Sequence, residues 1–158
     1  MRAALTAAAR AAALFGGFLL LLAMAVTCAS VLRGAFGRPI LGDSEVVEMS
    51  LGVAIALCLA WGEMRGAHVI VDVFTQRLRP RPLAWLEALV RAAVALVAAV
   101  LAARLAVGAF DQWDRERDTM FLQIPYWWGF AGATLGLLLW TAAAALVAAE
   151  RWHAARAA

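Results

Sequence analysis

Four long apolar runs dominate this sequence and limit how it can fold. They occupy residues 11–32, 46–62, 83–110 and 127–149. Each is close to the length of roughly 20 residues that a helix needs to cross the hydrocarbon core of a bilayer. The chain of 158 residues is 65% hydrophobic, so a single small soluble core could not bury its apolar side chains. The runs therefore predict an all-α membrane protein with four transmembrane helices.

The four runs fill most of the chain, so we expect one transmembrane domain over residues 1–158. The first run follows Arg2 and Arg10, as the apolar part of a signal peptide would. That part of a signal peptide usually has about 7–15 residues, and the run over 11–32 is longer. We therefore expect the first run to be retained as a membrane span.

The distribution of arginine predicts the orientation, because short loops rich in arginine stay in the cytoplasm. The two ends of the chain and the second connection contain Arg2, Arg10, Arg65, Arg77, Arg79, Arg81, Arg151 and Arg156. The first and third connections contain fewer arginines, and the third also contains several acids: Asp111, Asp114, Glu116 and Asp118. Both termini are therefore expected in the cytoplasm.

The stretch AWGEMRGAHVIVDVF, residues 60–74, is the most polar feature near a span. A metal site here would need the side chains of Glu63, His68 and Asp72 to converge. On a continuous helix, however, Glu63 and His68 are five residues apart and would point in directions that differ by roughly 140°. A break at Gly66 would be needed to bring them together. A solvated turn, or a segment lying among the lipid headgroups, remains open as an alternative.

Other redox, metal and enzyme chemistry is not expected. His68 and His153 lie outside the spans, so they cannot hold a haem within the bundle as a histidine pair. Cys28 and Cys58 lie at different depths and are expected to be free thiols. The acidic run DQWDRERD lacks the glycine and the spacing of a calcium loop. We therefore expect no catalytic residues, no metal, no cofactor and no nucleic-acid partner.

Several segments together resemble the small membrane subunit (DctQ-like) of tripartite ATP-independent periplasmic (TRAP) transporters. These are GDSEVVE before the second span, RGAHVIVDVFTQRL after it, and TMFLQIPYWWGFAGATLG leading into the fourth. The positions that carry the resemblance are Gly66, His68 and Asp72, supported by Glu45, Ile124, Pro125 and Trp127. Met64 departs from the basic residue that many members carry there, which argues against a fixed charge role for this motif.

The resemblance implies a scaffold subunit of a sodium-coupled uptake system for an organic acid in the bacterial inner membrane. Such a subunit binds a large membrane subunit (DctM-like), which carries the substrate and sodium sites. A periplasmic substrate-binding protein (DctP-like) delivers the solute. The stretch containing His68 and Asp72 is then expected to form a cytoplasmic elbow, which holds the second helix or contacts the partner.

Two further contacts are predicted from the spans. Gly132 and Gly136 form a Gly-x-x-x-Gly pair, which allows two helix backbones to approach closely in lipid, either within the bundle or against the large subunit. Glu48 and Arg104 lie at similar depths, about 6 and 9 Å below the outer surface, and are expected to form an ion pair. Separate snorkelling to the surface, or pairing with the large subunit, remains open for both charges.

The competing function is a stand-alone four-helix membrane protein such as a small multidrug exporter. Such exporters use a glutamate inside the first helix, and residues 11–32 contain no acid. A subunit that depends on partners is therefore the favoured hypothesis.

Overall fold

The computed structural model describes residues 2–37, 40–66 and 80–157, and these form four long helices. The helices are α1 (Arg2–Ala35), α2 (Asp43–Arg65), α4 (Pro80–Asp114) and α5 (Trp127–Ala157). All four are long and apolar enough to cross a membrane, and each contains one of the predicted spans. The prediction of an all-α protein with four spanning helices is therefore confirmed.

The helices extend beyond the predicted spans. With 34 and 35 residues, α1 and α4 are each about 50 Å long, whereas the hydrocarbon core of a bilayer is about 30 Å thick. Their ends must therefore tilt or project past the hydrocarbon.

Glycine sets both ends of α2. Gly42 precedes the helix with φ 85°, and Gly66 follows it with φ 66°. Both conformations are left-handed, which glycine adopts at little cost. The Gly66 amide donates to the carbonyl oxygen of Glu63 at 3.1 Å and closes the last turn. A side chain at Gly42 would also collide with Leu122, because its Cβ would lie 2.7 Å from the Leu122 Cγ.

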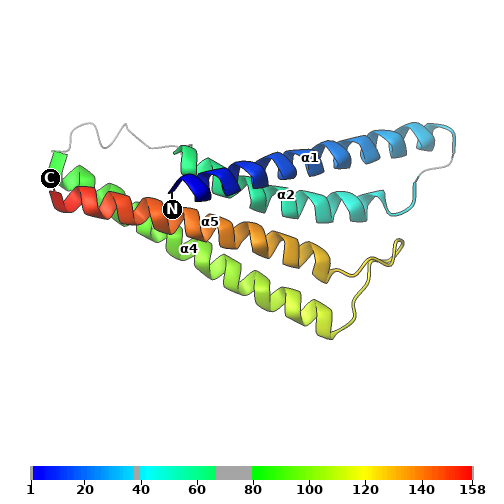
Figure 1. Cartoon of the computed structure of the whole chain (residues 1–158). Helices are drawn as coiled ribbons and strands as arrows, with labels where there is room; N and C mark the ends of the chain where they lie inside the picture. The colour runs from blue at the N-terminus through cyan, green and yellow to red at the C-terminus, as the bar shows by residue number, and fades with distance from the viewer. Residues whose placement is uncertain (1, 38–39, 67–79, 158) are drawn as a thin grey trace.

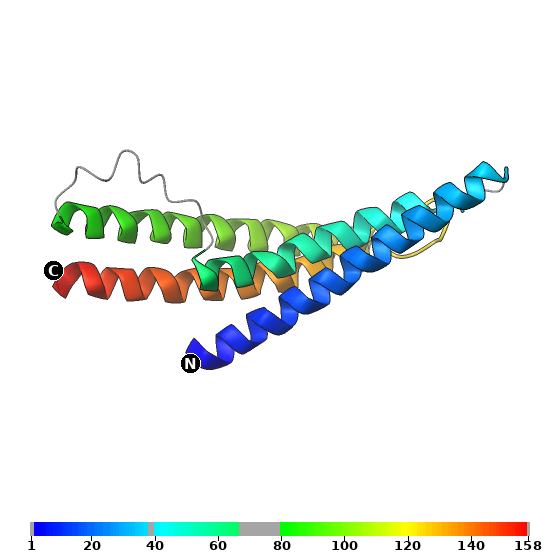
Figure 2. The ribbon, with the colours of Figure 1, turned by 90° about the horizontal axis from the view of Figure 1, so that it is seen from above.

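The helices are arranged as two antiparallel pairs joined through the middle (Figures 1 and 2). α1 packs against α2, α4 packs against α5, and α2 packs against α5. The pairs are displaced along their length, so that α4 and α5 extend past the N-terminus of α1 (Figure 1). Since α2 and α5 are the inner helices, their contact determines how the two pairs sit on each other.

Small side chains make up much of the interior, and large apolar side chains face outward. Ala9, Ala60 and Ala98 are fully buried beside Trp140. By contrast, Phe18 and Leu89 are about as exposed as surface residues of a soluble protein, at 59% and 63%. This distribution suits lipid, in which small residues allow helices to pack closely and large apolar residues face the acyl chains.

The closest approach between α2 and α5 occurs at the predicted glycine pair. A Cβ added at Gly136 would lie 2.7 Å from the backbone carbonyl carbon of Ala56, and one added at Gly132 would lie 3.0 Å from Val53 Cγ2. Gly129, one turn earlier, faces Met49 in the same way. The glycines of α5 therefore pack against α2 inside the bundle and do not face lipid.

We predict that Gly136→Ala destabilises the protein, because the new methyl group meets backbone atoms of α2 that cannot rotate away. Overpacking of this kind costs about 1–3 kcal/mol. Reversible unfolding in mixed detergent and dodecyl sulfate micelles measures the effect. Gly17→Ala in α1 is the control, since a Cβ there meets nothing within 4 Å. Equal stability of the two variants would contradict the close contact.

Candidate functional site

A buried carboxylate joins three helices at the end of α2. Glu63 is only 1% exposed. Its Oε1 accepts a hydrogen bond from Arg91 Nη1 of α4 at 3.0 Å. Its Oε2 lies 3.4 Å from Trp140 Nε1 of α5, a longer and weaker contact. The Arg91 side chain is itself mostly buried, so this ion pair is screened from solvent on both sides.

This cluster was not predicted from the sequence. Glu63 was a candidate only for a metal site with His68 and Asp72, and no role was predicted for Arg91. A signal was present in the sequence, because Arg91 is a charge within an apolar run and Trp140 is a tryptophan far from either end of its span. Charges inside a span tend to pair within the protein.

A second buried carboxylate fixes the connection between α4 and α5. Glu45, in the first turn of α2, is 8% exposed. Its two carboxylate oxygens accept hydrogen bonds from the backbone amides of Phe121 and Leu122, at 2.9 and 3.0 Å. Glu45 was a candidate residue by resemblance, and the structure gives it a defined contact across 76 residues of sequence.

The connection itself folds back as a short hairpin. The Thr119 amide donates to the Ile124 carbonyl oxygen, and the Ile124 amide donates to Thr119 Oγ1, both at 3.0 Å. Pro125 lies opposite Asp118 in an isolated antiparallel bridge. Trp127 begins α5 directly after it, with its ring edge-on to Trp128. Pro125 and Trp127 therefore belong to the segment that Glu45 holds against α2.

The structure describes only the first residue of the motif formed by Gly66, His68 and Asp72. Gly66 ends α2 in the left-handed conformation. His68 and Asp72 lie outside the described residues, and so does the elbow predicted for them. Their roles stay predictions.

The predicted ion pair between Glu48 and Arg104 is not formed. The described residues form ion pairs between Arg2 and Glu150, Glu63 and Arg91, and Glu87 and Arg151. Glu48 and Arg104 are in none of these pairs, and both side chains are exposed on the bundle. The physical reason is the lateral placement of the helices: a groove lies between α2 and α4 at the level of Glu48, and the two helices meet farther along, where Glu63 binds Arg91.

Glu48 instead lines an apolar groove of about 200 Å³. The groove lies between α2 and α4, with α5 as its floor, and it is bounded by Glu48, Met49, Gly52, Leu105, Tyr126, Gly129, Phe130 and Ala133. We call it the Glu48 groove. It combines an apolar wall with one carboxylate that has no hydrogen-bond or ion-pair partner in the part of the chain that the structure describes.

The fold and these contacts define a four-helix membrane protein in which the buried carboxylates of Glu45 and Glu63 accept hydrogen bonds from other segments of the chain. The family model of the DctQ component of tripartite ATP-independent periplasmic transporters matches residues 22–154. The chain therefore belongs to the DctQ family and is the small membrane subunit of a TRAP transporter. Neither the curated proteins nor the solved structures gave a significant match.

We predict that Arg91→Ala strongly destabilises the subunit, because it leaves the Glu63 carboxylate buried beside an empty space. Breaking a buried ion pair on one side costs about 3–5 kcal/mol. Arg151→Ala is the matched control, since its pair with Glu87 is largely exposed and such pairs contribute about 0–1 kcal/mol. Unfolding in mixed micelles measures both variants. Similar losses in the two variants would show that the Glu63 pair is not shielded as the structure indicates.

We predict that Glu45→Ala releases the connection between α4 and α5. The amides of Phe121 and Leu122 lose their acceptors, so their hydrogen exchange should accelerate while exchange in the middle of α5 stays unchanged. Mass spectrometry of the peptide covering residues 117–126 measures the effect. Glu48→Ala is the control, because Glu48 lies one turn further along α2 and accepts no hydrogen bond from the described residues of the connection. Unchanged hydrogen exchange in Glu45→Ala would show that the Glu45 carboxylate does not hold the connection in place.

Proposed function

We propose that this chain is a scaffold subunit, forming one four-helix domain, of a sodium-coupled, binding-protein-dependent transporter that imports an organic acid. Its family membership carries the proposal. The structure supports it, because the buried carboxylates of Glu45 and Glu63 already accept hydrogen bonds from this chain and serve to hold its helices together. The substrate and sodium sites then belong to the large DctM-like subunit, and a DctP-like periplasmic protein delivers the solute.

The charge distribution supports an orientation with both termini in the cytoplasm of a bacterium, across the inner membrane. Among the described residues, α1 begins at Arg2, α2 ends at Arg65 and the last turn of α5 contains Arg156, and these helix ends lie toward the end of the bundle that holds the two chain termini (Figure 1). The connection between α4 and α5 lies at the other end and contains Glu116 and Asp118 (Figure 1). This arrangement follows the general rule that arginine-rich segments of membrane proteins stay on the cytoplasmic side of the membrane.

The Glu48 groove is the face that we assign to the large subunit. A carboxylate within a span costs about 2.5–3.5 kcal/mol when it faces lipid, so a donor from a neighbouring protein helix would stabilise it. The groove is apolar apart from Glu48 and the Tyr126 hydroxyl, which suits a transmembrane helix with one donor side chain. Gly52 leaves room for that helix, since no atom lies within 4 Å of where its Cβ would be.

We predict that the chain alone transports nothing. Reconstituted by itself with an imposed sodium gradient, it should give no uptake of a radiolabelled organic acid in the presence of the binding protein. Addition of the large subunit should restore uptake, because that subunit would supply the substrate and sodium sites. Sodium-driven uptake by the small subunit alone would refute the scaffold role.

We predict that Glu48→Gln and Gly52→Leu both weaken the complex with the large subunit. The first removes the charge from the groove, and the second adds bulk to the groove at a position where a Cβ meets no atom of this chain within 4 Å. Each should lower the recovery of the large subunit on an affinity tag several-fold while the stability of the isolated chain is retained. Asp114→Asn is the control, because this exposed acid lies at the same end of the bundle but outside the groove. Full recovery with Gly52→Leu would place the interface on another face.

A further inference from the structure

A second groove lies at the opposite end of the bundle, along α1. It has a volume of about 800 Å³ and lies between α1 and the Trp61 ring of α2. It is bounded by Arg2, Thr6, Arg10, Leu14 and Trp61, and its other lining residues are alanines of α1. We call it the Arg10 groove. It shares no lining residue with the Glu48 groove.

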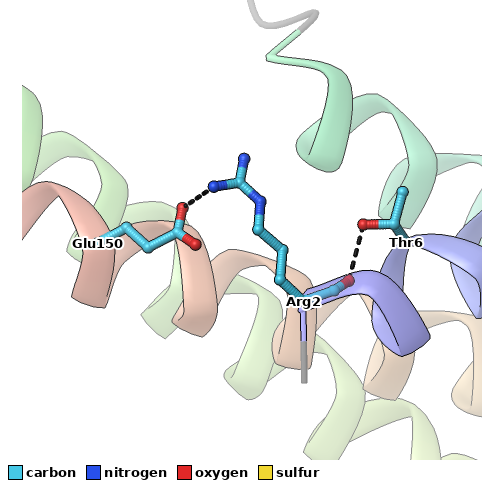
Figure 3. A network of polar contacts seen from close by, with 3 residues as sticks. All are labelled: Arg2, Thr6 and Glu150. Atoms are coloured by element: carbon cyan, nitrogen blue, oxygen red, sulfur yellow. Dashed lines mark hydrogen bonds and ion pairs between the residues drawn. The ribbon is translucent and has the colours of Figure 1, made fainter.

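The polar groups of the Arg10 groove are concentrated toward the start of α1. Arg2 is held by Glu150 of α5 at 2.9 Å, and Thr6 Oγ1 donates to the Arg2 carbonyl oxygen at 2.8 Å (Figure 3). Arg10 is exposed and has no ion-pair or hydrogen-bond partner among the residues that the structure describes. Its guanidinium therefore offers N–H donors that no acceptor of this chain uses.

Arg65, which stacks on Trp61, adds positive charge on the other side of the groove. The guanidinium carbon of Arg65 lies over its ring, 4.9 Å from the ring centroid. Tryptophan rings prefer the headgroup level of a membrane, where one part of the ring is apolar and the N–H is hydrated. The ring of Trp61 and the guanidinium of Arg10 thus line one groove at a level suited to lipid headgroups.

Below Arg10 the same face of α1 is apolar. Ala11 and Leu14 continue the lining of the groove. Phe18 and Leu21 follow at helical spacing and are 59% and 61% exposed. The face therefore changes from cationic donors to apolar surface along the helix axis.

We propose that the Arg10 groove binds an anionic phospholipid, with the headgroup phosphate at Arg10 and an acyl chain along Leu14, Phe18 and Leu21. The change from cationic to apolar surface matches the shape of an amphiphile, whereas a free phosphate would use only the upper half of the groove. Basic pockets beside transmembrane helices on the cytoplasmic side are a general means of binding anionic lipid. The lipid would fill the space between α1 and Trp61 and hold α1 against the bundle.

The proposal is tested on the full chain purified in mild detergent, by native mass spectrometry with added lipid. The probes are dioleoyl phosphatidylglycerol, dioleoyl phosphatidylcholine and inorganic phosphate. We expect phosphatidylglycerol to bind the wild type at least about fivefold more tightly than phosphatidylcholine, the factor that one arginine near an anionic group contributes. Inorganic phosphate at millimolar concentration should not displace it. Equal binding of the two lipids, or displacement by phosphate, would overturn the lipid assignment.

Variants of Arg10 locate the site. Arg10→Gln should weaken phosphatidylglycerol binding about fivefold and leave phosphatidylcholine binding unchanged, and Arg10→Lys should lie between it and the wild type. Arg33→Gln is the matched control, because Arg33 is an exposed arginine near the other end of α1. The proposal is wrong if Arg10→Gln and Arg33→Gln bind the lipid alike.

A protein occupant gives a different result. If Arg10→Gln retains full lipid binding but recovers less of the large subunit, the groove is a protein contact and the lipid proposal is refuted. Lipid binding is measured without the large subunit, so its outcome does not depend on the role proposed for the Glu48 groove.

Discussion

The contact between α2 and α5 is the interaction on which the rest of the structure depends. Each outer helix packs mainly against one inner helix, so this contact is the main one that unites the two antiparallel pairs. It is close because Gly136 brings the backbone of α5 against Ala56, where a methyl group has no room. In lipid, apolar side chains gain little by leaving the acyl chains, so close packing and buried polar contacts must hold helices together.

Two buried carboxylates of α2 strengthen this contact at its ends. Glu63 binds Arg91 of α4 and approaches Trp140 of α5 at one end. At the other end, Glu45 binds backbone amides of the connection between α4 and α5. Both carboxylates lie on α2 and both bind groups of the second helix pair. These two buried carboxylates therefore have a structural use, which agrees with a subunit that positions a partner.

The order of the helices also leaves open surfaces on the bundle. α5 separates α2 from α4 at the level of Glu48, which leaves the Glu48 groove between them. On the other side, α1 packs against α2 alone over most of its length, which exposes the Arg10 groove and the apolar stripe below it. One surface has an acidic group among apolar residues and the other has basic groups above apolar residues. The two surfaces are therefore suited to different neighbours, which we propose are a protein helix and a lipid.

Hydrophobic patterning predicted the four helices, because run length alone determines which segments can span a bilayer. A close helix contact at Gly132 and Gly136 was also predictable, since glycine spacing on a helix is a local property, but that its partner is α2 and not the large subunit came from the structure. The pairing of charges could not be predicted from the sequence. Glu48 and Arg104 share a depth, but a groove lies between α2 and α4 at that level. The same two helices meet farther along the bundle, where Glu63 binds Arg91, so the lateral placement of the helices decides which charges pair. That placement depends on contacts between distant segments, and depth along the membrane normal carries no information about it.

The most direct test of the scaffold role is to identify what accompanies the chain in its native membrane. A tagged full-length chain, extracted in mild detergent, is purified in one step and its partners are identified by mass spectrometry. The account predicts a large multi-span membrane subunit in about a one-to-one ratio, lost when the Glu48 groove is filled by Gly52→Leu. Recovery of the chain only as copies of itself, as expected for a stand-alone four-helix exporter, would contradict it.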